Sequence, residues 1–349
     1  MKMIKVGIIG ATGYSGSELV RILYHHPKVD IITLSSNSHN DQVYSSVFEN
    51  FNKISEMKCE EEDLESLSEE LDVVFLALPN GKAFELLTDS ILKNVKVIDL
   101  SGDFRLKDVG VYEEWYKLKH LNESLIDKAT YGLSEWKRSQ IKNSSLISNP
   151  GCYPTCALLS LLPLIKENIL EENSIIIDAK SGVSGAGRSL NLTTHFSECN
   201  ESIKPYSVKS HRHTPEIEQE LNEITGNGNS IIFTPHLLPM NRGILCTIYG
   251  TLKQQINYDE IKNIYEKYYK DEYFIRLTKE NIFPETKWVK GSNYCDIGFT
   301  SDKRSNKIII IGAIDNLIKG AAGQAVQNMN IMFNLKENMG LDSIPIFPI

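Results

Sequence analysis

Cys152 is the residue whose type and position point most directly to chemistry. It lies in the segment SNPGCYPTCALLSLLPL, residues 148–164, between a Pro-Gly turn and a long apolar run. The apolar run predicts a helix, so we expect Cys152 at or just before a helix N-terminus, where the dipole and the amides favour a thiolate. Pro154 fits the first turn of this helix, whereas Pro163 should kink or end it. We therefore predict an activated nucleophile; the alternative, a small buried hydrophobe, is the role expected of Cys156.

A thiolate nucleophile needs a partner that handles protons, and the segment KSHRHTPEIEQEL, residues 209–221, offers two histidines. Thr214 can cap a helix that has Pro215 at its first position. His211 and His213 then lie on the extended segment before the helix and share one face of it. We expect at least one of them to act as an acid or base, with His213 favoured.

Three arginines are candidate clamps for anionic groups, because a guanidinium binds a carboxylate or a phosphate through paired hydrogen bonds. They are Arg105 in VIDLSGDFRL, Arg188 in SGVSGAGR and Arg242 in TPHLLPMNRGIL. A surface arginine or an interdomain salt bridge is the alternative for any one of them. The glycine-rich stretch that ends at Arg188 could lie along a cofactor or a substrate.

A second glycine-rich stretch, GATGYSG at residues 10–16, follows an apolar run close to the N-terminus. It is a variant of the dinucleotide fingerprint, in which glycines let the backbone approach a pyrophosphate at a helix N-terminus. The candidate cofactor-binding residues are Gly10, Thr12, Gly13, Tyr14, Ser15 and Gly16. The alternative is a tight turn between a strand and a helix, with no ligand.

The next apolar run ends in TLSSNS, which places Ser35, Ser36 and Ser38 where NAD-binding folds carry an acidic residue for the ribose 2′-hydroxyl. No carboxylate stands there to repel a 2′-phosphate. The sequence therefore favours NADP(H), although hydroxyl groups at a strand end can also cap a turn.

The elements that must position these residues form two groups. Short β-rich runs at 4–10, 29–34, 72–79 and 95–100 alternate with helical patterns, which predicts a parallel βαβ sheet. The acidic stretch 55–71 is expected to be a surface insertion or a solvated helix without a chemical role.

From Cys152 onward the strands become longer, and this part predicts a second, mixed-sheet α+β domain. The strands are expected at 174–183, 229–237, 243–253 and 306–314, with helices near 215–225 and 258–270. A final helix, 316–335, opens with Asn316 and carries small residues that suit close packing against the cofactor domain.

Composition excludes several functional classes. The chain has 349 residues, 41% of them hydrophobic, which is more than one core usually organises, so two domains are expected. With 37 basic and 45 acidic residues the net charge is −8, and neither nucleic acid nor a membrane surface is an expected partner. The apolar run near the N-terminus is too short for a signal peptide, which indicates a cytoplasmic protein. Six scattered cysteines indicate neither disulfides nor a metal site.

Taken in order, the motifs resemble those of the N-acetyl-gamma-glutamyl-phosphate reductase family of arginine biosynthesis. The resemblance runs from residue 4 to about 335 and rests on seven segments: GATGYSG, VIDLSGDFRL, SNPGCYPT, SGVSGAGR, HRHTPEI, TPHLLPMNRGI and DNLIKGAAGQAVQN. The related aspartate-semialdehyde dehydrogenases share the plan but not these strings. One departure is LALPNG at 76–81, where the family pattern has histidine at the position of Asn80.

The resemblance implies an α/β fold with a Rossmann-type NADP-binding domain at 1–149, completed by a C-terminal helix within 316–349. It also implies a substrate-binding and oligomerisation domain at 150–315, and a homotetramer or homodimer. The implied reaction is the NADPH-dependent reduction of N-acetyl-L-glutamyl 5-phosphate to the 5-semialdehyde and phosphate through a Cys152 thioester.

The resemblance further implies roles for individual residues. Arg105 would hold the leaving phosphate, Arg242 with the histidine segment would bind the carboxylate or N-acetyl group, and Asn316 would orient the nicotinamide amide. Asn149 and Arg188 are further candidate substrate-binding residues, and Pro79, Gly182, Ser184 and Gly185 are candidates for the cofactor. No metal is expected.

Other functions stay open on the sequence. A cysteine hydrolase or acyltransferase could use Cys152 with a histidine, and a dinucleotide-sensing regulatory protein would use neither. Within the reductases, an aminoadipate-phosphate reductase or an aspartate-semialdehyde dehydrogenase is the alternative. The acidic chain, without a basic docking surface, argues against the acidic carrier protein that an aminoadipate-phosphate reductase needs.

Overall fold

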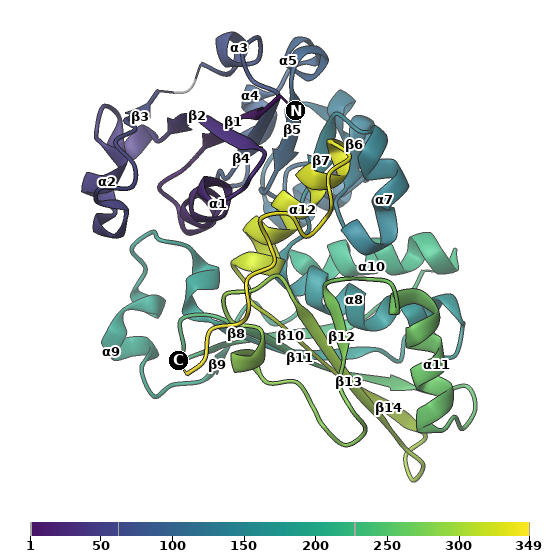
Figure 1. Cartoon of the computed structure of the whole chain (residues 1–349). Helices are drawn as coiled ribbons and strands as arrows, with labels where there is room; N and C mark the ends of the chain where they lie inside the picture. Colours follow the sequence, from purple (N-terminus) through teal and green to yellow (C-terminus); the bar gives the residue numbers. More distant parts are fainter. Residues whose placement is uncertain (1, 62, 227, 349) are drawn as a thin grey trace. The chain divides into compact units, whose positions relative to one another are not determined.

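The computed structural model describes three stretches of the chain: residues 2–61, 63–226 and 228–348. They form two compact units, the first made of residues 1–150 with 321–342 and the second of residues 151–320 with 343–349. Each unit contains one seven-stranded β-sheet (Figure 1).

The sheet of the first unit has the strand order β3-β2-β1-β4-β5-β7-β6, and all its pairs are parallel. Its strands are β1 Ile4–Ile9, β2 Val29–Ser35, β3 Cys59–Glu60, β4 Val73–Leu76, β5 Lys96–Asp99, β6 Ala129–Tyr131 and β7 Leu146–Ser148. The four residues of β4 are all buried, as expected for a parallel strand covered on both faces. The predicted parallel βαβ sheet is confirmed.

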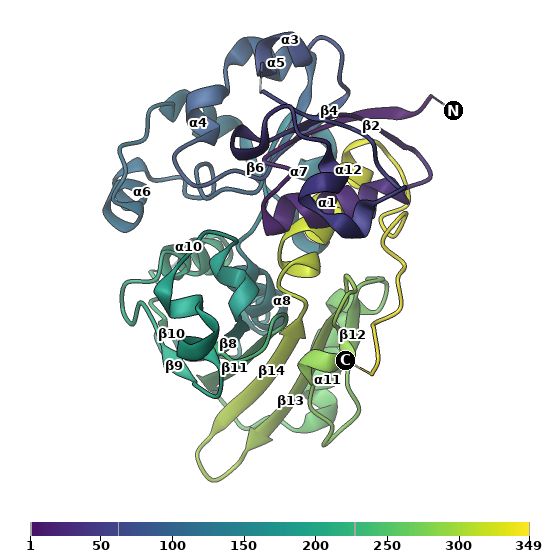
Figure 2. The same cartoon turned by 90° about the vertical axis from the view of Figure 1, so that its left-hand side faces the viewer.

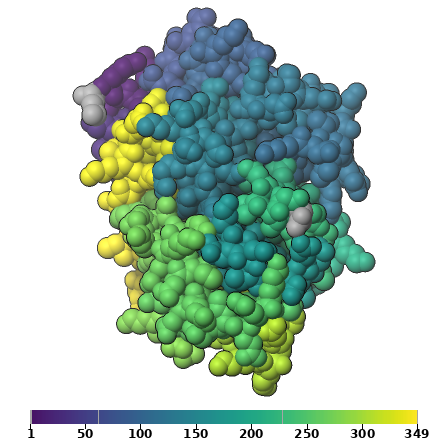
Figure 3. Space-filling view, turned by 90° about the vertical axis from the view of Figure 1, so that its right-hand side faces the viewer, coloured from purple at the N-terminus to yellow at the C-terminus, as the bar shows by residue number. Residues whose placement is uncertain are grey.

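The helices of the first unit follow the strands of its sheet. They are α1 Tyr14–Tyr24, α2 Tyr44–Val47, α3 Leu64–Leu67, α4 Ala83–Leu86, α5 Asp89–Asn94, α6 Val109–Tyr116 and α7 Ser134–Asn143, with α12 Gly323–Met332 added from the far end of the chain. Helix α12 contacts α1 and α7 (Figure 2). On the surface, yellow C-terminal residues lie between purple N-terminal residues and blue-green residues (Figure 3).

The sheet of the second unit has the order β12-β13-β14-β11-β8-β10-β9 and is mixed, with parallel pairs β8–β10 and β12–β13 and otherwise antiparallel pairs. Its strands are β8 Ile176–Gly182, β9 Lys204–Pro205, β10 Ile232–Leu238, β11 Ile244–Thr251, β12 Ile275–Leu277, β13 Cys295–Asp302 and β14 Lys307–Ile314. Burial alternates strictly along β11, so one face of this sheet belongs to the core. The predicted mixed α+β architecture is confirmed.

Helix α8, Cys152–Lys166, contacts β11 and β14 and is accompanied by α10 His213–Thr225 and α11 Tyr258–Tyr269; a short α9 spans Phe196–Cys199. Pro163 does not end α8, which continues for three more residues. The ring removes the N–H that would bond the Leu159 carbonyl, and the Tyr269 hydroxyl donates to that carbonyl at 2.7 Å instead. A neighbouring helix therefore satisfies the group that the proline leaves unpaired.

The final helix is shorter than expected. After β14 a π-helical turn spans Ile318–Ala322, α12 ends at Met332, and the described residues beyond it form no further helix. Asn334 and Gly340 adopt positive φ, and Pro345 and Pro348 follow, so this segment cannot continue a helix.

The acidic stretch 55–71 is neither an insertion nor a regular helix. Cys59 and Glu60 form the edge strand β3 beside the end of β2, and Leu64–Leu67 makes a single turn capped by Asp63. Residue 62 lies outside the described residues. In the described parts of the chain, no helix combines the length and the apolar character that crossing a bilayer requires.

Candidate active site

The structure places Cys152 at the first position of α8, as predicted. Gly151 is the N-cap, and its extended backbone (φ −65°, ψ 155°) leads the chain into the helix. The Cys152 side chain is half-buried, and none of the six cysteines, all in the described part of the chain, is in a disulfide. The first amides of a helix have no carbonyl partner four residues earlier, so Cys152 lies at the positive end of the helix dipole.

Two residues of α10 contact the start of α8 at Gly151. A Cβ atom on Gly151 would lie 2.5 Å from Nε2 of His213, so only glycine leaves room for the imidazole there. The Gly151 N–H donates to Oε1 of the fully buried Glu216 at 2.7 Å. Sequence reasoning missed Glu216, although a carboxylate in the first turn of a predicted helix is a recognisable signal.

The two histidines lie together, but not on the extended segment that the sequence predicted. His213 is the first residue of α10, and Thr214 is not the cap. Nδ1 of His211 accepts the N–H of His213 at 3.1 Å, so an imidazole caps the helix and α10 begins before Thr214. The ring centroids of His211 and His213 are 4.7 Å apart.

Aromatic rings surround His211 on several sides. Tyr153, Tyr206 and Phe233 each make an edge contact with its ring, at centroid distances of 5.3 to 5.7 Å. Burial, with a smaller effect of the Arg212 charge, lowers the pKa of His211 to about 3. His211 is therefore neutral throughout the physiological range.

The chain returns to Cys152 at Gly320. A Cβ atom on Gly320 would lie 2.8 Å from Cβ of Cys152, so the π-helical turn packs directly against the cysteine. The buried Asp315 holds the start of this turn, since its Oδ1 accepts the N–H groups of Leu317 and Ile318 at 2.9 and 3.1 Å. Such π-turns are frequent at functional sites.

Three predicted segments meet in a loop cluster of the second unit. Oδ1 of Asn316 accepts the Gly243 N–H at 2.8 Å, and its Nδ2 donates to Oγ of Ser184 at 2.9 Å. A Cβ atom on Gly182 would lie 2.6 Å from the carbonyl oxygen of Asn241. Gly182, Ser184 and Asn316 are thus brought together as the sequence suggested, with the Asn316 amide holding the neighbouring loops.

The arginines of the second unit have different surroundings. Nη1 of Arg242 lies 3.7 Å from Oδ2 of the buried Asp315, so Arg242 is tied to the residue that organises the turn beside Cys152. Gly185 and Arg188 both lie on the exposed segment around Gly187, which has a φ of +82°. These contacts therefore place Arg242 beside the loop cluster, and Gly185 too, where a Cβ atom would lie 3.8 Å from Nδ2 of Asn316.

The glycine-rich stretch 10–16 has the geometry that the fingerprint predicts. Gly10 has a φ of +83°, and a side chain there would collide with the Ala77 carbonyl. A side chain on Gly16 would collide with the backbone of Gly10 and Ala11. Gly13 is the N-cap of α1, and Tyr14 and Ser15 open its first turn. This loop can bring bare backbone to a pyrophosphate.

A chain of hydroxyl groups runs from this loop to the end of β2. The Oγ1 of Thr12 and the Oγ of Ser36 are 2.6 Å apart, and both side chains are buried. The Oγ of Ser38 lies 3.4 Å from that of Ser36 and 2.9 Å from Nδ1 of His39. Ser35 takes part through its carbonyl, which accepts the N–H groups of residues 10 and 11. Sequence reasoning missed His39.

Arg105 and Asn149 are both buried in the first unit. Nε of Arg105 donates to the Asn149 carbonyl at 2.8 Å, and its Nη2 donates to the Leu100 carbonyl at 2.9 Å. The Asn149 side chain donates to the Ala321 carbonyl and accepts from Asn328. Arg105 therefore links the carboxyl ends of strands β5 and β7, and Asn149 links the end of β7 to the segment that contains α12.

Two aspartates near Arg105 organise the loops after β4 and β5. Asp103 accepts the N–H groups of Gly81 and Ala83 at 2.7 and 3.0 Å, and the oxygen of Asn80 accepts the Gly102 N–H at 2.8 Å. Burial and the Asp103 charge raise the pKa of Asp99 to about 7. The sequence signal for both was an acidic residue after a buried strand, at the sheet edge where ligands bind. Pro79, in the loop after β4, is exposed.

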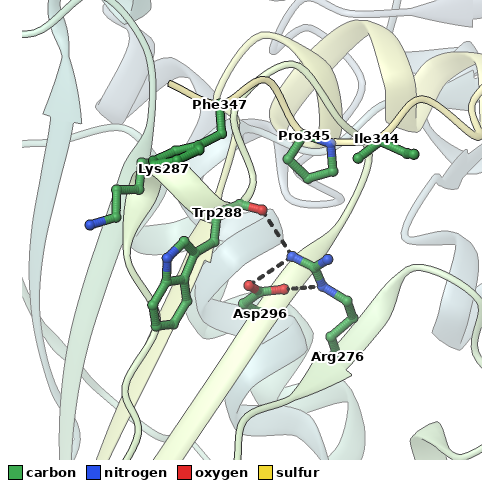
Figure 4. A pocket seen from close by; sticks show the side chains of 7 residues that line it. All are labelled: Arg276, Lys287, Trp288, Asp296, Ile344, Pro345 and Phe347. Carbon is green, nitrogen blue, oxygen red and sulfur yellow. Dashed lines mark hydrogen bonds and ion pairs between the residues drawn. The ribbon is translucent and has the colours of Figure 1, made fainter. Parts of the chain in front are cut away.

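A cavity of about 560 Å³ lies elsewhere in the second unit (Figure 4). It is lined by Arg276, Lys287, Trp288, Asp296, Ile344, Pro345 and Phe347. Arg276 is paired with Asp296 through contacts of 2.6 and 2.9 Å, so its charge is already compensated. No predicted site residue lines this cavity. Among the described residues, no group of three acidic, histidine or cysteine side chains could hold a metal ion.

Two family models match the chain. The model described as "Semialdehyde dehydrogenase, NAD binding domain" matches residues 5–144, and the model described as "Semialdehyde dehydrogenase, dimerisation domain" matches residues 152–316. These two ranges together cover most of the chain.

Curated relatives and solved structures agree with these models. The chain is 55% identical over 346 residues to an N-acetyl-gamma-glutamyl-phosphate reductase of Lachnoclostridium phytofermentans, covering 99% of this chain and 100% of the relative. It is 52% identical to the enzyme of that name from Campylobacter jejuni, covering 97% and 98%. In fold it resembles aspartate semialdehyde dehydrogenase II from Vibrio cholerae, with a TM-score of 0.73, 18% identity and coverage of 95% and 99%. An aspartate semialdehyde dehydrogenase with NADP from Candida albicans gives a TM-score of 0.67 at 17% identity, covering 97% and 100%.

Proposed function

Because the chain belongs to the N-acetyl-gamma-glutamyl-phosphate reductase family, an oxidoreductase family with semialdehyde dehydrogenase domains, we propose that it reduces N-acetyl-L-glutamyl 5-phosphate with NADPH. The products are N-acetyl-L-glutamate 5-semialdehyde and phosphate, and the reaction belongs to arginine biosynthesis. The observation that carries the proposal is the position of Cys152 at the start of α8, next to Gly151, against which the His213 ring packs.

In the proposed reaction the Cys152 thiolate attacks the acyl carbon, the bond to the phosphate oxygen breaks, and a thioester forms. A covalent intermediate divides one difficult step into two easier ones. When bound, NADPH would supply the hydride for reduction of the thioester to a thiohemiacetal. Collapse of the thiohemiacetal returns the electron pair of the C–S bond to sulfur and releases the semialdehyde.

His213 handles the proton in this scheme. It donates to the oxyanion as the thiohemiacetal forms and accepts the proton again when the thiohemiacetal collapses. The amides of Cys152 and Tyr153 at the start of α8 stabilise the oxyanion, while Glu216 engages the Gly151 amide. His211 keeps His213 in place through its bond to the His213 N–H.

The residues of the first unit suit NADP(H). Side chains at Gly10 and Gly16 would collide with neighbouring backbone, so this loop offers bare backbone to the pyrophosphate. Thr12, Gly13, Tyr14 and Ser15 complete the loop and the first turn of α1. The remaining candidates for the cofactor are Ser35, Ser36, Ser38, Pro79, Gly182, Ser184, Gly185 and Asn316. Because the Asn316 amide is bonded to Gly243 and Ser184, we propose that it sets the position of those loops.

The arginines are the proposed binding partners of the substrate's anionic groups. We propose that Arg242, held by Asp315, binds the carboxylate or the N-acetyl group, and that Arg105 attracts the leaving phosphate while its other bonds hold the loop after β5. Asn149 then acts by fixing the segment before Gly151. The exposed Arg188 is the least supported candidate.

The two units have different proposed roles. We propose residues 1–149 with the C-terminal helix as the NADP-binding domain and residues 150–315 as the substrate-binding and oligomerisation domain. On β11 the side chains that α8 does not cover, such as Leu245 and Tyr249, are half-buried, which supports a homodimer or homotetramer built on this sheet. A nucleophilic thiol that must stay reduced also suits the cytoplasm.

The test is the reverse reaction with purified protein. N-acetyl-glutamate semialdehyde, phosphate and NADP+ should give NADPH. Without phosphate, the reaction should stop after one NADPH has formed per active site. For aspartate semialdehyde and the aminoadipate analogue, kcat/KM should be at least about 100-fold lower. Groups of the protein that bind the N-acetyl group and the carboxylate of the proposed substrate would lose their hydrogen-bond partners. Equal use of aspartate semialdehyde would refute the proposed substrate.

Gly151 provides a test of the cysteine–histidine geometry. Its φ of −65° is open to alanine, so Gly151→Ala adds only the Cβ atom that would lie 2.5 Å from Nε2 of His213. We expect the ring to move and kcat to fall about 100-fold with the fold retained, as for other displaced catalytic groups. Gly228→Ala, where a Cβ atom meets nothing within 4 Å, is the matched control. Circular dichroism of both variants reports whether the fold is retained, and their kcat values test the expected loss of activity.

A further inference from the structure

The hydrogen-bonded series of polar side chains after β2 ends in His39, a residue to which the proposed function gives no role. In this fold the ribose 2′ oxygen of a dinucleotide lies at the carboxyl end of the second strand. Here that strand ends at Ser35, and the series continues from Ser36 to Ser38 and to the ring of His39. The His39 side chain is half-buried and lies in a short 3-10 turn.

His39 is also the one group in the segment 35–42 that can carry positive charge, since this segment contains no lysine or arginine. Asp41 follows two residues later on the same segment, and the Glu60 carbonyl of the neighbouring strand β3 accepts the Ser36 N–H at 3.3 Å. Glu18 and Arg21 of α1 are paired with each other at 2.9 Å.

The hydrogen bond between Ser38 and His39 changes direction with the charge of the ring. When the ring is neutral and Nδ1 accepts, the Ser38 hydroxyl hydrogen is used, at 2.9 Å. When the ring is protonated, Nδ1–H donates to Ser38, and the hydroxyl hydrogen becomes available to another acceptor. One proton therefore supplies both a positive charge and a further hydroxyl donor.

We propose that His39 recognises the 2′-phosphate of NADP(H), acting with the hydroxyl groups of Ser36 and Ser38. This proposal rests on the proposed function and names the residue that sets its cofactor preference. An imidazole N–H of His39 donates a hydrogen bond to the phosphate, and this bond is charge-assisted when the ring is protonated.

The experiment compares His39→Gln and His39→Arg with the unchanged protein. Each is titrated with 2′,5′-ADP and with 5′-AMP, which differ only in the 2′-phosphate, and KM is measured for NADPH and NADH. We expect His39→Gln to weaken binding of 2′,5′-ADP and to raise KM for NADPH by about 10- to 100-fold, the range for loss of a charged hydrogen bond. Binding of 5′-AMP and KM for NADH should change less than about twofold. His25→Gln, an exposed histidine at the end of α1, is the matched control.

His39→Arg tests whether a cation at this position is sufficient. Because arginine keeps a positive charge and hydrogen-bond donors, His39→Arg should bind 2′,5′-ADP at least as tightly as the unchanged protein does. A His39→Gln variant that keeps full preference for 2′,5′-ADP would overturn this inference alone. If the unchanged protein does not distinguish NADPH from NADH, the proposed cofactor fails and this inference fails with it.

Discussion

Replacing Cys152 by serine should reduce turnover at least about a thousandfold, because loss of a covalent nucleophile costs up to about a millionfold in other enzymes. The hydroxyl occupies the space of the thiol, and Gly320 still packs against the same Cβ atom. The fold should therefore persist while the nucleophile does not, since a serine hydroxyl is not made anionic by a helix dipole at neutral pH.

The covalent step can be measured separately from turnover. Without phosphate, the semialdehyde and NADP+ should give a burst of one NADPH per active site and an acylated protein detectable by mass spectrometry. Cys152→Ser should show neither. Cys199→Ser, a half-buried cysteine on α9, is the control and should keep the burst and a rate within about twofold. A serine variant at position 152 with near-normal turnover would refute covalent catalysis.

Replacing His213 by asparagine should lower kcat by about 100- to 10,000-fold, the usual contribution of a positioned acid or base. His211→Asn should cost less than about tenfold, because a ring whose pKa is about 3 is a weak base and carries no acidic proton near neutral pH, and an asparagine oxygen can still accept the His213 N–H. His213→Asn therefore tests the proton transfer, whereas His211→Asn tests the hydrogen bond that caps α10.

The pH profile distinguishes the two histidines. The pKa of His211 is about 3, so His211 remains neutral at every pH from 5 to 9 and cannot produce a change in rate within that range. Any limb of the kcat profile between pH 5 and 9 that reports the acid or base should persist in His211→Asn and disappear in His213→Asn. Loss of the limb in His211→Asn would reverse this assignment.

Local sequence signals were sufficient for several elements. The Pro-Gly turn before an apolar run placed Cys152 at the start of α8, and the glycines of residues 10–16 predicted the turn into α1, because both depend on contacts within a few residues. Strands β1 and β2 lie within one residue of their predicted bounds for the same reason. The short strands β6 and β7 were not predicted, since three residues carry too little pattern.

Other features depended on distant residues. The sequence could not predict that Tyr269 satisfies the carbonyl left by Pro163, or that the His211 ring caps α10. It also gave no sign that Asn149 and Arg105 would be bonded to backbone carbonyls. Each of these outcomes is a hydrogen bond whose partner the chain brings close only on folding.

By itself the sequence determined the architecture, the family and the chemical character of the site, because residue type, spacing and helix signals are properties of short segments. Only the tertiary structure shows that His211 stays neutral, since burial lowers its pKa to about 3. The His211 ring lies among Tyr153, Tyr206 and Phe233, whereas the His213 ring, which Tyr153 also contacts, packs against Gly151. Desolvation by residues distant in sequence sets the charge of a buried imidazole, and that environment exists only in the folded chain.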